Sequence, residues 1–87
     1  MRVEIKSSFL RDLKKLNKNE QSKALNLIDI CENSTSINEI ENIKKISGFT
    51  NFYRIRLGNY RVGLKIENEI ITFVRYLHQK DIYKFFP

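Results

Sequence analysis

The sequence predicts an α+β fold: an N-terminal strand, a helical hairpin, an antiparallel β-meander and a short C-terminal helix. Three observations predict it. Apolar residues recur at helical spacing as far as Cys31 and alternate with polar residues from Thr50 onward. Gly58-Asn59 separates two of the alternating segments by two residues, as a tight hairpin turn does. The 87 residues have the length of one domain, so residues 1–87 are expected to form a single unit.

The first strand is predicted at Arg2–Lys6, where Val3 and Ile5 alternate with charged residues. Ser7 or Ser8 is then expected to cap a helix. The apolar face of this helix is predicted from residues at helical spacing: Phe9, Leu13 and Leu16, with Leu10 beside them.

A second helix is predicted after a break at Asn17–Asn19, with Asn19 as its cap. Its buried face is predicted from four residues at helical spacing: Ala24, Leu27, Ile28 and Cys31. Two amphipathic helices joined by so short a break predict an antiparallel helical hairpin. Beyond it, Ser36 and Glu39 have the spacing of a capping box, which predicts one further short helical turn.

The second half of the chain predicts three strands rich in β-branched and aromatic residues: Thr50–Leu57, Tyr60–Ile66 and Glu69–Leu77. Gly58-Asn59 is expected to form the first turn of this meander, and Glu67-Asn68 the second. Because one face of the meander is apolar, the helices are expected to pack against it. A short helical turn is predicted within Gln79–Phe85.

A two-residue turn at Gly58-Asn59 determines which side chains share a face of the sheet. Arg56 then lies opposite Arg61, Arg54 lies two residues along the same strand, and directly opposed residues point to the same side. We call this set (Arg54, Arg56 and Arg61) the arginine face. Opposed like charges destabilise a hairpin unless an anion neutralises them, and guanidinium groups match phosphate oxygens. The pattern therefore indicates a phosphate-binding surface, with a solvated strand face as the alternative.

The turn expected at Glu67-Asn68 sets a second register. It places Lys65 opposite Ile70, and in that register Tyr76 and His78 lie along the arginine face. A shift of one residue would move both side chains to the other face. His78 is the only histidine, and a lone histidine is more often structural than catalytic.

The charge distribution indicates a polyanionic partner. Residues 1–43 contain seven basic and seven acidic side chains, whereas residues 44–87 contain nine basic and three acidic ones. The net charge of +6 therefore comes entirely from the second half, as expected of a surface that meets nucleic acid.

The composition argues against several other classes of protein. A single cysteine, Cys31, cannot form an internal disulfide and fits a reducing compartment, so a cytoplasmic location is expected. The apolar runs are far shorter than the roughly 20 residues of a membrane span. The sequence has no nucleotide-binding glycine motif, HExxH or paired cysteines, so no cofactor and no metal is expected. Catalysis would then depend on basic side chains, a tyrosine and the histidine, a set that fits attack of an RNA 2′-hydroxyl on its neighbouring phosphate.

Three segments of the second half resemble the RelE/ParE toxin superfamily. They are Lys45–Gly48, then Tyr53–Val62 with its sequence YRIRLGNYRV, and His78–Tyr83 with its sequence HQKDIY. With the helical hairpin before them, the resemblance covers nearly the whole chain and is closest to the RelE branch. It implies a RelE-like fold and a ribosome-dependent, metal-independent endoribonuclease that cleaves mRNA in the ribosomal A site. The partners it implies are a RelB-type antitoxin and a 70S-type ribosome with its mRNA and ribosomal RNA.

The resemblance also implies a role for each matching residue. Arg54 and Arg56 match a basic pair that contacts the scissile phosphate, and Arg61 matches a basic residue with the same role. Tyr83 matches a C-terminal tyrosine that orients the substrate or stacks on it, and His78 matches a histidine that acts as acid or base. The other basic residues expected to contact RNA or phosphate are Lys44, Lys45, Lys65 and Lys80.

The sequence departs from these relatives at Gln79, where they commonly carry an arginine, and this puts full catalytic strength in doubt. Arg54 and Arg56 stand where some relatives have lysine, and arginine stays protonated, so neither is expected to act as a general base. Two alternatives to the nuclease stay open: a ParE-like poison of DNA gyrase, and a catalytically weak homologue that only binds its antitoxin. An Arg61→Ala variant distinguishes the nuclease from the gyrase poison, because a nuclease would lose activity and a gyrase poison would tolerate the change.

Overall fold

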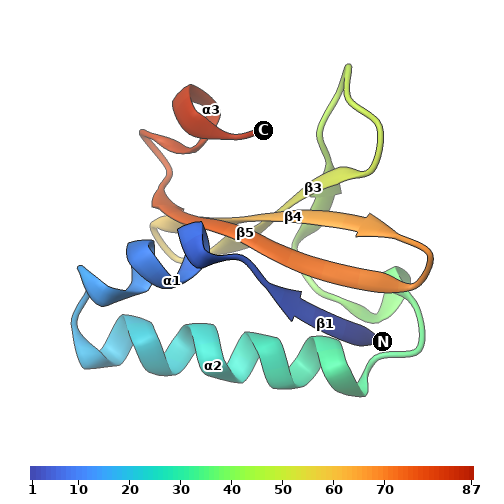
Figure 1. Ribbon diagram of the computed structural model, residues 1–87, viewed down its shortest axis with the longest axis horizontal. Helices are drawn as coiled ribbons and strands as arrows, with labels where there is room; N and C mark the ends of the chain where they lie inside the picture. Colours follow the sequence, from blue (N-terminus) through green and yellow to red (C-terminus); the bar gives the residue numbers. More distant parts are fainter.

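The computed structural model describes residues 1–87 as one five-stranded sheet with helices on both faces (Figure 1). The elements are β1 (Arg2–Ile5), α1 (Ser7–Lys14), α2 (Lys18–Asn33), a 3₁₀ turn (Ile37–Glu39), β2 (Ile43–Lys45), β3 (Phe52–Leu57), β4 (Tyr60–Glu67), β5 (Ile70–His78) and α3 (Ile82–Phe85). The strand order is β1-β5-β4-β3-β2, in which β1 runs parallel to β5 and all other neighbours are antiparallel. The predicted α+β class is confirmed. None of the helices has the length and apolar run that crossing a membrane requires.

The helical hairpin forms as predicted, although its caps differ. Asn17, and not Asn19, caps α2: its side chain accepts a hydrogen bond from the Glu20 backbone N–H at 2.9 Å. Neither Ser7 nor Ser8 caps α1, because the Ser8 hydroxyl donates instead to the Val74 carbonyl of β5 at 2.6 Å. The capping box after α2 is confirmed.

The core lies between the helical hairpin and one face of the sheet. We call this side the core face; Phe9 packs there edge-on against Phe73 and Tyr76, with ring centroids 5.3 and 6.0 Å apart. Thirteen buried residues make up the cluster: Phe9, Leu13, Ala24, Leu27, Cys31, Ile40, Ile55, Val62, Leu64, Ile66, Ile71, Phe73 and Tyr76. Most of the apolar positions predicted for the two helices belong to it or pack against it, whereas Leu10 is about half exposed.

The first hairpin has the predicted register. Leu57 lies opposite Tyr60, Arg56 opposite Arg61 and Ile55 opposite Val62. Gly58, with a φ of 61°, supplies the left-handed conformation that such a turn needs.

The second hairpin is different, and the predicted turn at Glu67-Asn68 is wrong. Asn68 and Glu69 occupy the turn with φ values of 53° and 63°, so Glu67 lies opposite Ile70. The register then shifts at a bulge, because Gly63 pairs with Arg75 and Leu64 with Phe73, which leaves Val74 without a partner on β4.

The bulge corrects the prediction for the end of β5, whereas the change of turn alone leaves each β5 side chain on its predicted face. Tyr76 pairs with Val62 and His78 with Tyr60, so both point to the core face and not along the arginine face. Tyr76 is 1% exposed and belongs to the core cluster.

Candidate nucleic-acid interface

The sheet face opposite the core carries a row of cations. Lys44 on β2 lies opposite Arg54 on β3, which lies opposite Gly63 on β4, and Gly63 in turn lies opposite Arg75 on β5. Opposed residues point to one side of a sheet, so this row crosses four strands with three cations, of which Arg75 is paired with Asp12 of α1. Arg54 donates one hydrogen bond, to the Asn42 carbonyl at 3.2 Å.

The neighbouring row contains the opposed pair of arginines. The guanidinium of Arg61 donates to the carbonyls of Gly58 and Tyr60, both at 2.9 Å, and to Oε1 of Gln79 at 3.1 Å. Arg56 is exposed. No residue of the arginine face takes part in a salt bridge, so its positive charge is uncompensated and attracts anions.

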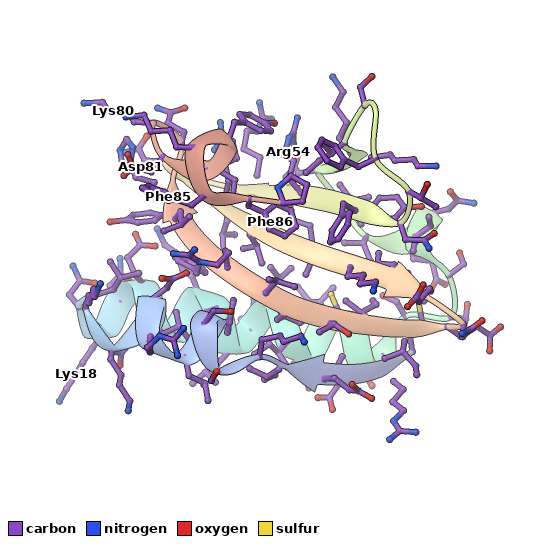
Figure 2. All side chains as sticks on the ribbon, turned by 45° about the horizontal axis from the view of Figure 1, so that its top comes forward. Lys18, Arg54, Lys80, Asp81, Phe85 and Phe86 are labelled. Atoms are coloured by element: carbon purple, nitrogen blue, oxygen red, sulfur yellow. The ribbon has the colours of Figure 1, made fainter.

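The C-terminal segment covers the middle of this side of the sheet. Phe86 is buried in a small apolar cluster with Ile46 and Ile82. The Phe86 ring lies directly on Gly63: a Cβ atom at that glycine would come within 2.8 Å of three ring atoms. Gly63 therefore allows the segment to approach the sheet, and α3 brings Tyr83, which is 63% exposed, to the arginine face. Figure 2 shows Arg54 and Phe86 on this side and Lys18 on the opposite, helical side.

A hollow of about 540 Å³ lies between the β2–β3 region and the C-terminal segment. Four of the predicted site residues line it: Lys44, Lys45, Arg54 and Tyr83. Its other lining residues are Ile46, Ser47, Phe49, Phe86 and Pro87. With three cationic side chains and no aspartate or glutamate in its wall, the hollow favours an anionic ligand.

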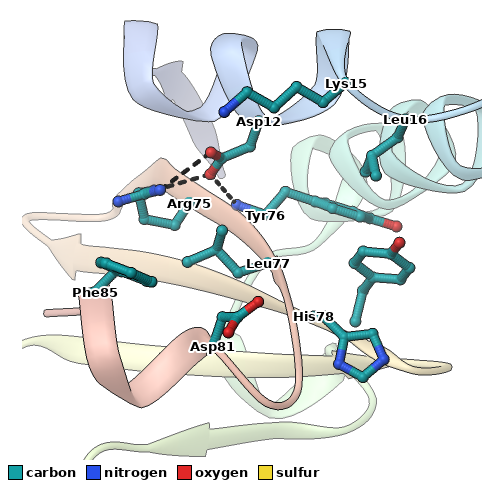
Figure 3. A pocket seen from close by; sticks show the side chains of 10 residues that line it. Asp12, Lys15, Leu16, Arg75, Tyr76, Leu77, His78, Asp81 and Phe85 are labelled. Atoms are coloured by element: carbon teal, nitrogen blue, oxygen red, sulfur yellow. Dashed lines mark hydrogen bonds and ion pairs between the residues drawn. The ribbon is translucent and has the colours of Figure 1, made fainter.

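His78 lies apart from this hollow. Its ring packs edge-on against Tyr60 at 5.6 Å on the core face, and its Nδ1 accepts a hydrogen bond from the Lys80 backbone N–H at 3.1 Å. It lines a separate hollow of about 380 Å³ beside α1, with Tyr60, Asp81 and Phe85 (Figure 3).

Two predicted lysines also lie outside the hollow that Arg54 lines. Lys65 forms an ion pair with Glu67 at 3.3 Å. Lys80 is exposed on the turn after β5. Both side chains therefore belong to the wider basic surface rather than to this hollow.

Sequence reasoning missed a polar link between α1 and β5. Asp12 is 7% exposed, and its carboxylate accepts hydrogen bonds from the Arg75 guanidinium at 2.8 and 3.1 Å and from the Tyr76 N–H at 2.9 Å (Figure 3). This hydrogen-bonded carboxylate raises the pKa of Arg75. The Arg75 guanidinium also lies 5.9 Å from the centre of the Phe85 ring. The signal in the sequence was an aspartate on the apolar face of a helix, where a charge needs a buried partner.

Two other titratable groups are buried on the core side. Burial raises the pKa of the Tyr76 hydroxyl, which donates a hydrogen bond to Glu20 at 2.8 Å. Burial also raises the pKa of the Cys31 thiol to about 11, so this cysteine is an unreactive core residue. No group of three or more His, Cys, Asp or Glu side chains is placed to hold a metal ion.

Solved structures share this fold. The toxin in the RelB-RelE antitoxin-toxin complex from Methanococcus jannaschii is 40% identical, with a TM-score of 0.82 over 97% of this chain and 99% of that one. The archaeal RelE-RelB complex from Pyrococcus horikoshii gives 26% identity and a TM-score of 0.75 over 93% and 97% of the two chains. The fold and the sequence identity to these structures thus define the class of small α+β toxins of the RelE type.

The sequence comparisons give the family. Toxin RelE3 of Methanocaldococcus jannaschii is 42% identical over 88 residues, which span 100% of both chains. The family model described as the ParE toxin of the type II toxin-antitoxin system, parDE, matches residues 3–83. The chain therefore belongs to the RelE/ParE superfamily of toxins from type II toxin-antitoxin systems.

Proposed function

We propose that this toxin is a ribosome-dependent endoribonuclease that cleaves mRNA in the A site without a metal ion, and that a RelB-type antitoxin holds it inactive. One observation carries the nuclease proposal: the arginine face, without ion-pair partners, lies beside a cationic hollow that an exposed tyrosine lines. The antitoxin half is supported by the two archaeal relatives, whose structures are complexes of RelE with RelB. A cytoplasmic location follows from the ribosomal target.

The proposed reaction is attack of an RNA 2′-hydroxyl on the adjacent phosphorus. The 2′-hydroxyl releases its proton to water as the new bond joins the 2′-oxygen to phosphorus. The bond to the 5′-oxygen breaks, which leaves a cyclic phosphate and, after that oxygen takes up a proton, a 5′-hydroxyl. Guanidinium groups of Arg54 and Arg61 stabilise the charge that develops on the phosphate oxygens, because they stay protonated and donate hydrogen bonds. In this proposal Tyr83 orients the substrate and passes a proton to the leaving 5′-oxygen.

The remaining predicted residues have supporting roles in this proposal. Arg56 adds charge at the scissile phosphate, and the lysines bind the RNA backbone through contacts that weaken with salt: Lys44, Lys45, Lys65 and Lys80. His78 as an acid or base stays a prediction. The His78 ring lies on the core face against Tyr60, whereas Tyr83 lines the hollow beside Arg54. We therefore assign the proton donor to Tyr83.

Primer extension on a translated reporter mRNA tests the proposal. The wild type should produce breaks inside codons only when ribosomes are present. Arg61→Ala should weaken them by roughly 10²–10³-fold, the typical effect of removing one donor to a developing oxyanion. The Tyr83→Phe variant should weaken them as well. Lys18→Ala serves as the matched control, since Lys18 projects from the opposite side of the molecule (Figure 2).

Gyrase poisoning is the second candidate, and one observation favours it: the matching family model is that of the ParE toxins. A gyrase poison would stabilise cleaved DNA–gyrase complexes in a purified assay and would tolerate Arg61→Ala. Cell arrest without mRNA breaks, together with such complexes, would replace the nuclease proposal by this one.

A further inference from the structure

The loop between β2 and β3 exposes a large apolar side chain beside the arginine face. Phe49 is 51% exposed, and its aromatic contact is an edge-on one with Phe52 at 6.3 Å. Gly48 and Asn51, on either side of it, have φ values of 83° and 67°. Such left-handed residues make a tight turn. The loop rises from the sheet on the same side as α3 (Figure 1).

Phe49 also belongs to the wall of the cationic hollow. It contributes to this wall from the β2–β3 loop and Tyr83 contributes from α3, while Lys44 and Arg54 line the same space from β2 and β3. The two aromatic side chains are thus 51% and 63% exposed, and both border one hollow with unpaired cations.

Two further phenylalanine rings support the position of Phe49. Its edge-on contact with Phe52 continues in a second edge-on contact, between Phe52 and Phe86 at 5.6 Å. Because Phe86 is 3% exposed and lies on Gly63, this row of rings connects the loop to the sheet. The row supports Phe49 from one side and leaves about half of its surface open to a ligand.

We infer that the hollow is a base-binding subsite for single-stranded RNA, in which Phe49 stacks on a nucleobase while Lys44 and Arg54 hold phosphate groups. Single-stranded nucleic acid alternates flat bases with anionic phosphates, and aromatic side chains interleaved with cations match that alternation. Stacking accepts any base, because every base has a π-face, so the subsite positions the RNA and does not read its sequence. The inference rests on the proposed function and adds Phe49 as a substrate-positioning residue.

A stacking assay without ribosomes tests this inference. The full chain is titrated into a short single-stranded oligoribonucleotide that contains 2-aminopurine, whose fluorescence falls when an aromatic ring stacks on it. The wild type and Phe49→Trp should quench the signal. Phe49→Leu keeps an apolar side chain in the loop, but it should lose the quenching and bind roughly 5–150-fold more weakly, as loss of one stacked base implies.

Phe85→Leu is the matched control. Phe85 is 59% exposed, close to the value for Phe49, yet it lines the other hollow, beside Arg75. Its replacement should leave binding and quenching unchanged. Thermal melting of each variant confirms that the folds are intact.

Three outcomes of the stacking assay overturn the inference: no quenching by the wild type, equal quenching by Phe49→Leu, or an equal loss in Phe85→Leu. Unchanged RNA binding with weakened antitoxin binding in Phe49→Leu would also overturn it and make the hollow a protein-docking surface.

The failure of the proposed function can be distinguished from the failure of this inference. Quenching that depends on Phe49 without any mRNA breaks keeps the subsite and removes the nuclease, whereas breaks without such quenching do the reverse.

Discussion

The two faces of the sheet differ in what covers them. The core face meets α1 and α2 across thirteen buried residues, and the one buried acid there, Asp12, is fully hydrogen-bonded. The opposite side has a buried cluster of only three residues and carries the arginine face, without ion pairs. One face of the sheet therefore holds the fold together, while the other keeps its charge available for a ligand.

Because side chains alternate between the two faces along a strand, neighbouring residues serve the core and the ligand-binding face in turn. Ile55 is 1% exposed within the core, while Arg54 and Arg56 on either side of it point to the other face. The effect of a substitution should therefore depend on the face that a residue occupies and not on its place in the chain.

Phe9→Ala should have the largest effect on stability. The side chain is fully buried against Phe73 and Tyr76, so its removal leaves a cavity in the core and should lower the free energy of unfolding by about 3–5 kcal/mol. Urea unfolding measures this value. Leu10→Ala is the control, because Leu10 is 48% exposed and should cost less than about 1 kcal/mol. Equal losses in both variants would contradict the division into faces.

Asp12→Ala should be the next most severe change. It removes the acceptor for the Arg75 guanidinium and for the Tyr76 N–H, and leaves a mostly buried charge without its partner. Since Arg75 is 26% exposed and can turn towards water, we expect a loss of about 3 kcal/mol, at the lower end for a broken buried pair. Asp29→Ala, an exposed acid on α2, is the control for charge alone and should be nearly neutral in the same urea titration.

The two hairpins show how far the sequence predicts this fold. Gly58 provides the positive φ of the first turn, so the register and the arginine face follow correctly from the sequence. In the second turn Asn68 and Glu69 adopt positive φ without any glycine. Because glutamate rarely adopts a positive φ, the sequence does not indicate that the turn includes Glu69. The bulge at Val74 has no signal in the sequence, and it alone moves His78 from its predicted side to the core face.

The site was predictable to a similar degree. The residues of the arginine face follow from local pairing, and Tyr83 follows from the family resemblance. The short strand β2 was missed because three residues give no periodic signal. The pairing of Lys44 with Arg54 was missed for the same reason. Phe49 was missed because the hollow that it lines forms only where the β2–β3 loop meets the C-terminal segment, and these segments are distant in sequence.

Gly63→Ala tests how the C-terminal segment is held on the arginine side. The added methyl group would meet the Phe86 ring at 2.8 Å, so the ring must move. Overpacking of this kind costs about 1–3 kcal/mol, and the displaced segment should also reduce mRNA cleavage because Tyr83 moves with it. Urea unfolding and primer extension measure the two effects. In Gly48→Ala nothing lies within 4 Å of the added methyl group, so a loss of stability there measures the strain of a positive φ of 83° and not overpacking. Full cleavage activity in Gly63→Ala would show that Tyr83 does not depend on this contact.

Arg56→Gln should have the smallest effect on stability, with the opposite sign. Arg56 lies directly opposite Arg61 and has no ion-pair partner, so removing its charge relieves a repulsion and should stabilise the hairpin by about 0.2–1 kcal/mol. The same change should weaken mRNA cleavage, because in the proposed mechanism the positive charge of Arg56 stabilises the scissile phosphate and does not stabilise the fold. Arg2→Gln, on β1 and ion-paired to Glu4 at 3.8 Å, is the matched control and should neither stabilise the protein nor reduce cleavage. A less stable Arg56→Gln variant would mean that the arginine face contributes to folding. A more stable and less active one would show that this side of the sheet gives up stability for function.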